Sequence, residues 1–166
     1  MSEAVPMELV GVRIELPANQ PIVLLREREG TRHLAIFIGA VEATAIAYAI
    51  EGVVPQRPLT HDLLRDVSMA LGGQVSEVVV TELRNNVFFA DLIIDQTGEE
   101  IRISSRPSDA IALAVRTGAQ IFASQDVLED AGIEMRDDDE EEEIERFREF
   151  LDDITPEDFG SGTSTS

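Results

Sequence analysis

Two short segments of the sequence pair an arginine with acidic side chains at places where helices are predicted to begin. Residues 57–62 read Arg-Pro-Leu-Thr-His-Asp, and residues 106–109 read Arg-Pro-Ser-Asp. Proline suits the start of a helix, so each segment places its acidic residue in a first helical turn. A guanidinium group can hold a phosphate through two parallel hydrogen bonds, and the free N–H groups of a helix start add to that binding. Arg57 and Arg106 are therefore candidate phosphate ligands.

Carboxylates near these arginines could hold a divalent metal ion. Asp62 and Asp109 lie in the two segments, and Glu42 stands in the first turn of a third predicted helix. Carboxylate oxygens suit Mg²⁺ and Mn²⁺, and such an ion would neutralise a phosphodiester and activate a water molecule. His61 could transfer a proton near neutral pH. Together these residues predict a site for phosphodiester hydrolysis.

Each of these residues also has a simpler interpretation. Asp109 could do no more than cap its helix or pair with Arg106, and Glu42 no more than balance the dipole of its own helix. His61, at a helix start, could be an exposed residue without a catalytic role. The residue types and their spacing leave both interpretations open.

The helix that must position Arg106 and Asp109 has clear ends in the sequence. Pro107 suits its first position, and Gly118 suits the left-handed conformation that often ends a helix. Residues 110–115 between them are apolar on every side, which is typical of a buried helix. We therefore expect a core helix that presents Arg106 and Asp109 at its amino end.

Hydrophobic alternation and turn residues predict the other elements. Strands are expected at 7–16, 22–28, 32–38, 75–83, 87–94, 100–104 and 120–123. Helices are expected at 43–51, opened by residues 39–42, and at 60–71 and 126–131, with an extended piece at 133–135. Thr60 is a good cap for the helix at 60–71. The pattern predicts an α+β fold with a mostly antiparallel sheet and helices packed on it.

The predicted elements also suggest an internal repeat. Residues 10–52 and 75–118 share the order of three strands, a helix and a glycine, and aligning Glu42 with Asp109 matches the acidic residue and three alanines. This predicts two pseudo-repeated βββα halves, with the helix at 60–71 bridging them and both helix starts facing one cleft. In the alternative, two alanine-rich helices are similar by chance, and Glu42 and Asp109 lie too far apart to share a ligand.

The composition narrows the classes of function. The 166 residues carry a formal net charge of −20 and no lysine, whereas proteins that bind a phosphate backbone usually have a basic surface. Charge therefore disfavours nucleic acid as a partner. The absence of cysteine excludes disulfides, thiolate metal sites and cysteine nucleophiles. With no signal-like amino terminus and no apolar run of the ~18 residues that cross a bilayer, we expect a cytoplasmic protein that does not contact membranes.

The composition of the chain changes near residue 137. Residues 137–143 are all acidic, as in segments that stay solvated, and apolar residues recur at helical spacing from Ile144 to Ile154. We predict a domain at 5–136, and at 137–166 an acidic tail with one short amphipathic helix and a disordered end. The tail is expected either to solvate the domain or to act as an acidic lid that mimics phosphate at an arginine-bearing site.

Four segments together resemble one known family. Residues 38–43 read Ile-Gly-Ala-Val-Glu-Ala, residues 57–64 read Arg-Pro-Leu-Thr-His-Asp-Leu-Leu, residues 105–114 read Ser-Arg-Pro-Ser-Asp-Ala-Ile-Ala-Leu-Ala, and residues 117–119 read Thr-Gly-Ala. In this order they resemble the bifunctional nuclease domain family, formerly a domain of unknown function. The resemblance covers roughly residues 7–135, so the domain at 5–136 is predicted to be a bifunctional nuclease-like domain.

The resemblance implies an α+β fold, self-association into a homo-oligomer, and a nuclease activity on both RNA and DNA. It supplies no catalytic roles for individual residues, and the acidic tail is not part of the family's pattern. We therefore predict a nuclease that hydrolyses phosphodiester bonds with a divalent metal. The alternative is a non-catalytic oligomeric module that binds a protein partner or a small anion.

Overall fold

The computed structural model describes residues 3–135 of the chain. The chain divides into two units, Met1–Glu134 and Met135–Ser166, and only the first can be described. The acidic tail, its short helix and its disordered end lie outside the described residues, so the boundaries at 5–136 and 137–166 stay predictions.

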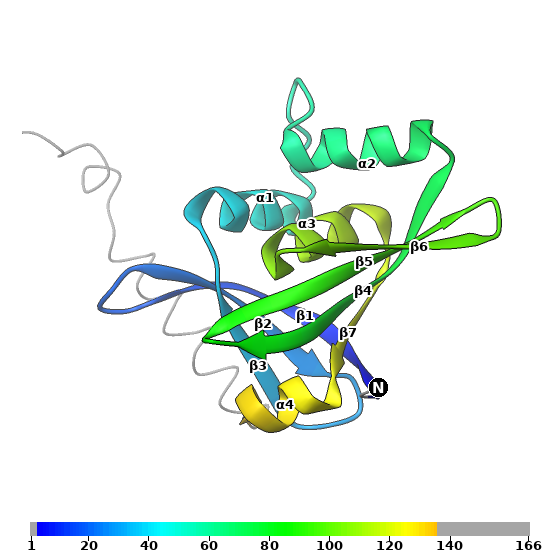
Figure 1. The fold of residues 1–166 in the computed structure, drawn as a ribbon. Coiled ribbons are helices and arrows are strands. Elements are labelled where there is room, and N and C mark those ends of the chain that lie inside the picture. Colours follow the sequence, from blue (N-terminus) through cyan, green and yellow to red (C-terminus); the bar gives the residue numbers. More distant parts are fainter. Residues whose placement is uncertain (1–2, 136–166) are drawn as a thin grey trace, which may run out of the picture. The chain divides into compact units, whose positions relative to one another are not determined.

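The first unit is built on one eight-stranded sheet with the order β6-β5-β4-β7-β1-β2-β3-β8 (Figure 1). The strands are β1 (Ala4–Glu15), β2 (Gln20–Glu27), β3 (Arg32–Phe37), β4 (Gly73–Arg84), β5 (Val87–Gln96), β6 (Glu99–Ser105), β7 (Gln120–Ser124) and β8 (Ile133–Glu134). Alternating apolar residues and short turns produce these strands, as the sequence predicts. Asn85 and Asn86, for example, both have positive φ in the tight turn between β4 and β5.

Two antiparallel meanders meet at β7. Strands β1, β2 and β3 form one meander, and β4, β5 and β6 form the other. Strand β7 pairs antiparallel with β1 and parallel with β4, and so joins the meanders into one sheet. The predicted α+β class and mostly antiparallel sheet are confirmed. The order βββα occurs in both halves, with another helix between them, but a duplication as its origin stays a prediction.

Four helices pack on this sheet in the described part of the chain. They are α1 (Ala40–Glu51), α2 (Thr60–Ala70), α3 (Pro107–Thr117) and α4 (Gln125–Ala131). Figure 1 shows α1, α2 and α3 gathered together, away from α4. Helices α1 and α2 both contact α3, and α3 contacts β4, β5 and β7. The starts of three helices that are far apart in the sequence can therefore share side-chain contacts.

Helix α3 is the buried central helix that the sequence predicts. Residues 110–114 are all at most 2% exposed, and their alanines let α1 approach closely. Pro107 occupies the first position of the helix, and Gly118 ends it at φ 76° with its N–H bonded to Ala114 O at 2.9 Å. These end signals fix the register of α3 and thereby place Arg106 and Asp109 at its start.

Helix α2 departs from the sequence prediction at its start. Thr60 is the first helical residue rather than the cap, and Leu59 takes the cap position. Because leucine has no polar side chain, the cap is completed from inside the helix, where Asp62 Oδ2 accepts the N–H of Leu59 at 3.0 Å. The prediction of Thr60 as the cap is wrong by one residue. The prediction also did not include the role of Asp62 in closing the cap of its own helix.

Candidate functional site

A bridge of hydrogen bonds joins the starts of α1 and α3. Arg106 Nη2 donates to Glu42 Oε1 at 3.0 Å and to Asp109 Oδ1 at 3.2 Å, and Arg106 Nε donates to Asp109 Oδ2 at 2.9 Å. These bonds raise the pKa of Arg106, with Asp109 as the larger cause. The Arg106 side chain is 65% exposed, and its Nη1 makes no hydrogen bond to any residue of 3–135. One edge of the guanidinium group thus remains available to a ligand.

The backbone at the start of α1 makes room for this bridge. The Glu42 side chain folds back over Gly39, which stands in the cap position in an extended conformation. A Cβ atom on Gly39 would collide with the Glu42 carboxylate. Glycine at this position therefore allows Glu42 to turn toward Arg106 instead of outward along its helix.

Asp109 also holds His61 of helix α2. His61 Nε2 lies 2.9 Å from Asp109 Oδ1, and the His61 side chain is 8% exposed. Burial raises the pKa of Asp109, but hydrogen bonds from Arg106 and His61 outweigh it, and the pKa lies below its usual value. An ionised carboxylate can only accept, so Nε2 carries the proton of this bond, and in the tautomer that this bond selects the lone pair lies on Nδ1. We call the four residues Glu42, His61, Arg106 and Asp109 the Arg106 cluster.

Asp62 does not join the Arg106 cluster, although it follows His61 in the chain. Its Oδ1 accepts from Arg116 Nε at 2.8 Å. Arg116 also donates to Ala45 O and Ala112 O at 2.9 Å each, and its side chain is only 5% exposed. Arg116 therefore ties together α1, α2 and α3.

Sequence reasoning missed Arg116 as a residue that positions the site. Its place in the last turn of α3 suggests only an interaction with the negative end of the helix dipole. The available signal was that Arg116 directly follows the apolar run at 110–115, where a buried arginine needs partners from other elements. By holding α2 against α3, Arg116 sets where His61 stands relative to Asp109.

Arg57 is placed apart from these side chains. It is exposed in the loop before α2 and makes no hydrogen bond or ion pair with a residue of the described range. The structure thus brings together Glu42, His61, Arg106 and Asp109, and leaves Arg57 and Asp62 outside.

The predicted metal ligands do not form one donor set in this arrangement. Asp62 is bonded to Arg116, while Glu42 and Asp109 share the positive charge of Arg106. Within residues 3–135, no three His, Cys, Asp or Glu side chains are grouped as a metal site requires. The side chains as they stand do not fit a bound cation, and we derive no reaction step through one.

The two low carboxyl pKa values predict a pH dependence of stability. The hydrogen bond from Arg116, followed by that from Leu59 N–H, holds the pKa of Asp62 below its usual 3.8. A carboxyl group whose pKa is lower in the folded state stabilises folding above its unfolded pKa, and this contribution is lost as the pH falls through the folded value. We expect the free energy of unfolding to fall more steeply below about pH 5 in the wild type than in Asp62→Asn. Urea unfolding across a pH series measures both slopes, and parallel curves would contradict the linkage.

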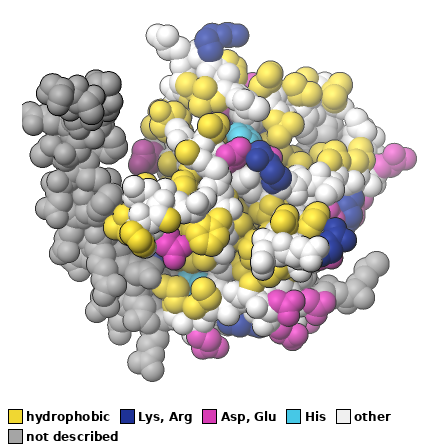
Figure 2. Space-filling model, turned by 60° about the vertical axis from the view of Figure 1, so that its left-hand side comes forward, with side chains coloured by type: hydrophobic (Ala, Val, Ile, Leu, Met, Phe, Trp, Pro, Cys, Tyr) yellow, Lys and Arg dark blue, Asp and Glu magenta, His cyan; other side chains and the backbone are white. Residues whose placement is uncertain are grey.

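Figure 2 shows hydrophobic side chains over much of one face, around a small group of acidic, basic and histidine side chains. Several large apolar side chains of α1 and α2 are exposed. They are Val41, Tyr48, Ile50, Leu63, Leu64, Val67 and Met69. The charged side chains of the Arg106 cluster are thus surrounded by apolar surface rather than by other basic side chains.

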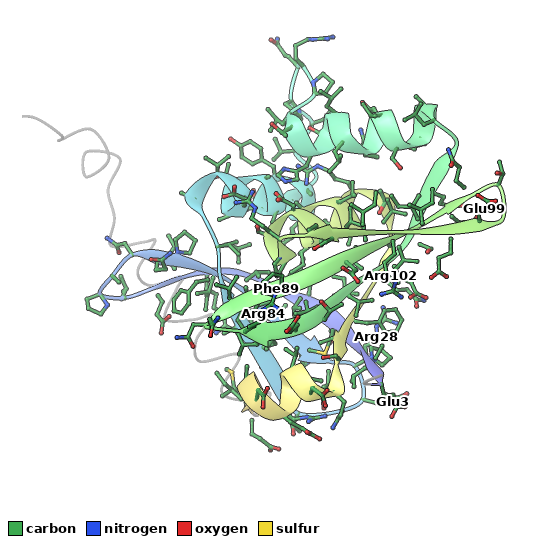
Figure 3. All side chains as sticks on the ribbon, in the orientation of Figure 1. Glu3, Arg28, Arg84, Phe89, Glu99 and Arg102 are labelled. Carbon is green, nitrogen blue, oxygen red and sulfur yellow. The ribbon has the colours of Figure 1, made fainter. Side chains whose placement is uncertain are left out.

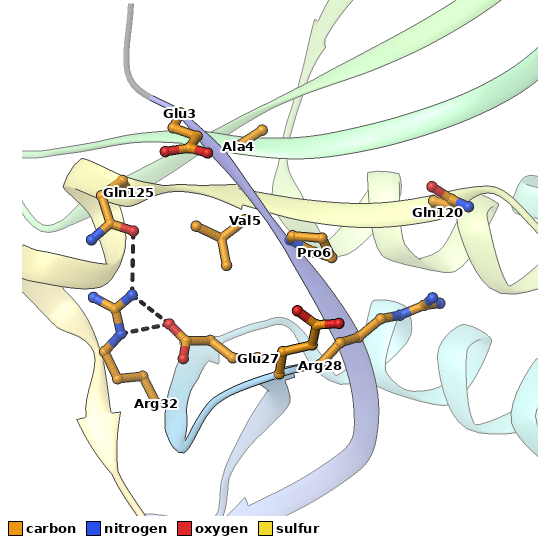
Figure 4. Close-up of a pocket in the computed structure, with 10 residues that line it drawn as sticks. Glu3, Ala4, Val5, Pro6, Glu27, Arg28, Arg32, Gln120 and Gln125 are labelled. Carbon is orange, nitrogen blue, oxygen red and sulfur yellow. Dashed lines mark hydrogen bonds and ion pairs between the residues drawn. The ribbon is translucent and has the colours of Figure 1, made fainter.

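A cavity lies apart from the Arg106 cluster, at the start of β1 and the end of β2 (Figure 4). It measures about 440 Å³, and Arg32 spans it by bonding to Glu27 and to Gln125. None of the six predicted site residues lines it. Arg32 and Glu27 are paired with each other, and Glu3 and Glu29 also line the cavity beside Arg28. Because these carboxylates would repel an anion, the cavity suits phosphate less well than the exposed edge of Arg106.

Comparison with known proteins identifies the family. The sequence pattern of the bifunctional nuclease domain matches residues 23–136 of this chain. The chain belongs to the bifunctional nuclease domain family, and the resemblance read from the sequence is confirmed. All members of the Arg106 cluster lie inside the matched range.

Relatives of this chain come from bacteria and plants. The uncharacterized proteins MT1877 and Rv1829, from two strains of Mycobacterium tuberculosis, are each 47% identical over 161 residues, which is 92% of this chain and 96% of theirs. Bifunctional nuclease 2 of Oryza sativa subsp. japonica is 28% identical over 127 residues, 74% of this chain and 39% of the rice protein. The likeness thus spans almost the whole of the bacterial proteins but only part of the plant nuclease.

None of the helices within residues 3–135 has the length and apolar character needed to span a membrane. Location in the cytoplasm and assembly into a homo-oligomer stay predictions.

Proposed function

We propose that this protein hydrolyses phosphodiester bonds of RNA and DNA at the Arg106 cluster. The observation that carries the proposal is the chain of bonds from Arg106 through Asp109 to His61, at the start of the central helix of a bifunctional nuclease domain. It combines an anion-binding group with an oriented imidazole, which are two of the parts that hydrolysis of a phosphate ester requires.

His61 acts as the general base in this proposal. Asp109 fixes the ring through Nε2 at 2.9 Å, and Nδ1 has no hydrogen-bond partner among the described residues. Nδ1 takes a proton from a water molecule while the water oxygen attacks phosphorus. The resulting imidazolium is stabilised by the Asp109 carboxylate.

Arg106 stabilises the charge that develops on the phosphate. Its Nη1 group donates to a non-bridging oxygen as the new bond from water to phosphorus forms. The bond from phosphorus to the leaving sugar oxygen breaks on the opposite side, this oxygen takes a proton from solvent water, and His61 returns its proton to the solvent. Because water rather than a ribose hydroxyl is the nucleophile, both RNA and DNA are substrates.

The divalent cation that the sequence suggests, Mg²⁺ or Mn²⁺, stays a proposal. Glu42 and Asp109 are the only members of the Arg106 cluster that could supply carboxylate oxygens to it, and both are bonded to Arg106. Cleavage that stops in chelator and returns with either ion would establish a requirement for the cation. Cleavage that persists in chelator would mean that Arg106, and not a cation, stabilises the charge that develops on the phosphate.

The arginines of the sheet are spread apart, and from this we predict that the affinity for nucleic acid depends little on salt concentration. Figure 3 shows Arg28, Arg84 and Arg102 spread along the sheet. Arg102 is bonded to Asp91 at 3.1 Å, and Arg84 lies over the Phe89 ring at 4.6 Å. Because these arginines of the described residues are spread apart rather than clustered, few counterions are released on binding, and affinity is expected to fall only slightly as salt rises.

A cleavage assay with Arg106→Gln tests the proposal. Labelled single-stranded RNA and DNA are incubated with the full-length protein in Mg²⁺, Mn²⁺ or chelator. Loss of a charged transition-state contact is expected to lower the rate by about 10²–10³. Arg65→Gln, which removes an arginine paired with Asp66 on α2, is the charge control and is expected to cleave like the wild type. Equal rates in all three proteins, or no cleavage by the wild type, would refute the site.

The rival function is a non-catalytic interaction module. Two observations favour it: the Arg106 cluster joins three helices with its charges mutually paired, and apolar side chains of α2 such as Leu63 and Met69 are exposed. On this view His61 is a buried structural residue and the exposed face binds a partner protein or a second copy. Cleavage that disappears in Arg106→Gln while the fold is retained excludes this rival.

A further inference from the structure

A pocket beside the Arg106 cluster has largely apolar walls. It measures about 330 Å³ and is lined by the end of β3, the start of β5 and the first turn of α3. Small-ligand pockets begin at about this size and are typically apolar with a few well-placed polar groups. We call it the Phe37 pocket; its walls include Phe37, Val87, Phe88, Arg106 and Ser108.

Aromatic surface is available at the mouth of the Phe37 pocket. Phe37 is 62% exposed at the end of β3. Phe88 is partly buried against the core and so provides a fixed wall. An aromatic ligand that stacks on Phe37 would cover this apolar surface.

Two polar groups of the Phe37 pocket lack partners. Ser108 is only 6% exposed, and its hydroxyl makes no hydrogen bond to any residue from 3 to 135. Because this hydroxyl belongs to a residue that lines the pocket, it is available to a ligand there. Arg106 Nη1 is the second group, at the edge shared with the Arg106 cluster.

We infer that the Phe37 pocket binds one unpaired nucleobase of a single-stranded nucleic acid. The base stacks on Phe37, its edge bonds to Ser108, and the adjoining phosphate lies at Arg106. This inference rests on the proposed function, because it takes the phosphodiester at Arg106 as the group next to the base. A base within a duplex is stacked and paired and cannot enter. Stacking uses the face that all bases share, so both RNA and DNA fit.

The absence of tryptophan in the chain allows a direct test. Phe37→Trp introduces a single tryptophan at the pocket and keeps an aromatic face. The full-length variant is titrated with a single-stranded oligonucleotide and with a blunt duplex of the same sequence. We expect the single strand to quench the fluorescence to saturation and the duplex to leave it unchanged.

Affinity measurements on truncated side chains complete the test. Phe37→Ala is expected to raise the Kd of the single strand by about 10-fold or more, and Ser108→Ala by about fivefold. Met69→Ala is the matched control, because Met69 is 65% exposed on α2 and outside the Phe37 pocket; its Kd is expected to stay within twofold of the wild type.

The outcomes separate this inference from the proposed hydrolysis. Quenching by the single strand without cleavage refutes hydrolysis and leaves the base pocket standing. Cleavage with neither quenching nor an effect of Phe37→Ala overturns the pocket and leaves hydrolysis standing. Quenching by a peptide that carries aromatic side chains, with none by the oligonucleotide, overturns the pocket in favour of a protein partner.

Discussion

Replacing Arg116 by methionine is expected to lower the free energy of unfolding by about 3–5 kcal/mol, because it leaves a charge unpaired in the interior. Arg116 is 5% exposed and Asp62 is 15% exposed in their ion pair. The change also leaves Ala45 O without the donor that links α1 to α3. Methionine is chosen because it fills a similar volume, so the loss reports on charge and hydrogen bonding rather than on a cavity.

Urea denaturation of two further variants, compared with Arg116→Met, separates these effects. Arg102→Met removes an arginine that is 53% exposed and bonded to Asp91, and is expected to change stability by no more than about 1 kcal/mol. The double change of Arg116→Met with Asp62→Leu removes both charges and is expected to recover part of the loss. A stability of Arg116→Met within 1 kcal/mol of the wild type would show that the three helices are held together in another way.

Replacing His61 by glutamine is expected to lower the cleavage rate by about 10²–10⁴, the usual contribution of general base catalysis. The glutamine amide can still donate to Asp109, so the bond at the start of α3 is kept while the group that accepts a proton is lost. Unfolding by urea is expected to be little changed, which distinguishes this variant from Arg116→Met.

Asp109→Asn provides the second arm of this experiment. An amide at this position can present its N–H group to the ring and favour the tautomer with the proton on Nδ1. We expect its rate to fall as far as that of His61→Gln, and the double variant to be no slower than either, because the two residues act as a unit. Multiplied losses in the double variant would mean that His61 and Asp109 act separately.

The sequence by itself determined the elements and the ends of the central helix. Pro107 and Gly118 mark α3, and its apolar run predicts burial, because these effects depend only on local backbone preferences and hydrophobic periodicity. The α+β class and the family also follow from local patterns. Of the six candidate site residues, Glu42, Arg106 and Asp109 contact one another in the structure. They were recognised for the same reason, because each lies in or beside a helix start.

The tertiary structure alone decided which acids share a site. His61 and Asp62 are adjacent in the chain, but successive residues of a helix point about 100° apart. His61 therefore faces Asp109, while Asp62 faces Arg116 and closes the cap at Leu59. Spacing along the chain could not distinguish the two directions without knowing where α1 and α3 lie.

Long-range packing also determined the role of Arg116 and the joining of the two meanders. The insertion of β7 between β4 and β1 pairs strands that are distant in sequence. It brings the halves into one sheet, with α1 and α2 both in contact with α3. Only in this arrangement is an arginine at the end of α3 buried against a carboxylate of α2 and a carbonyl of α1. Such contacts arise from the meeting of separate segments, and no local propensity encodes them.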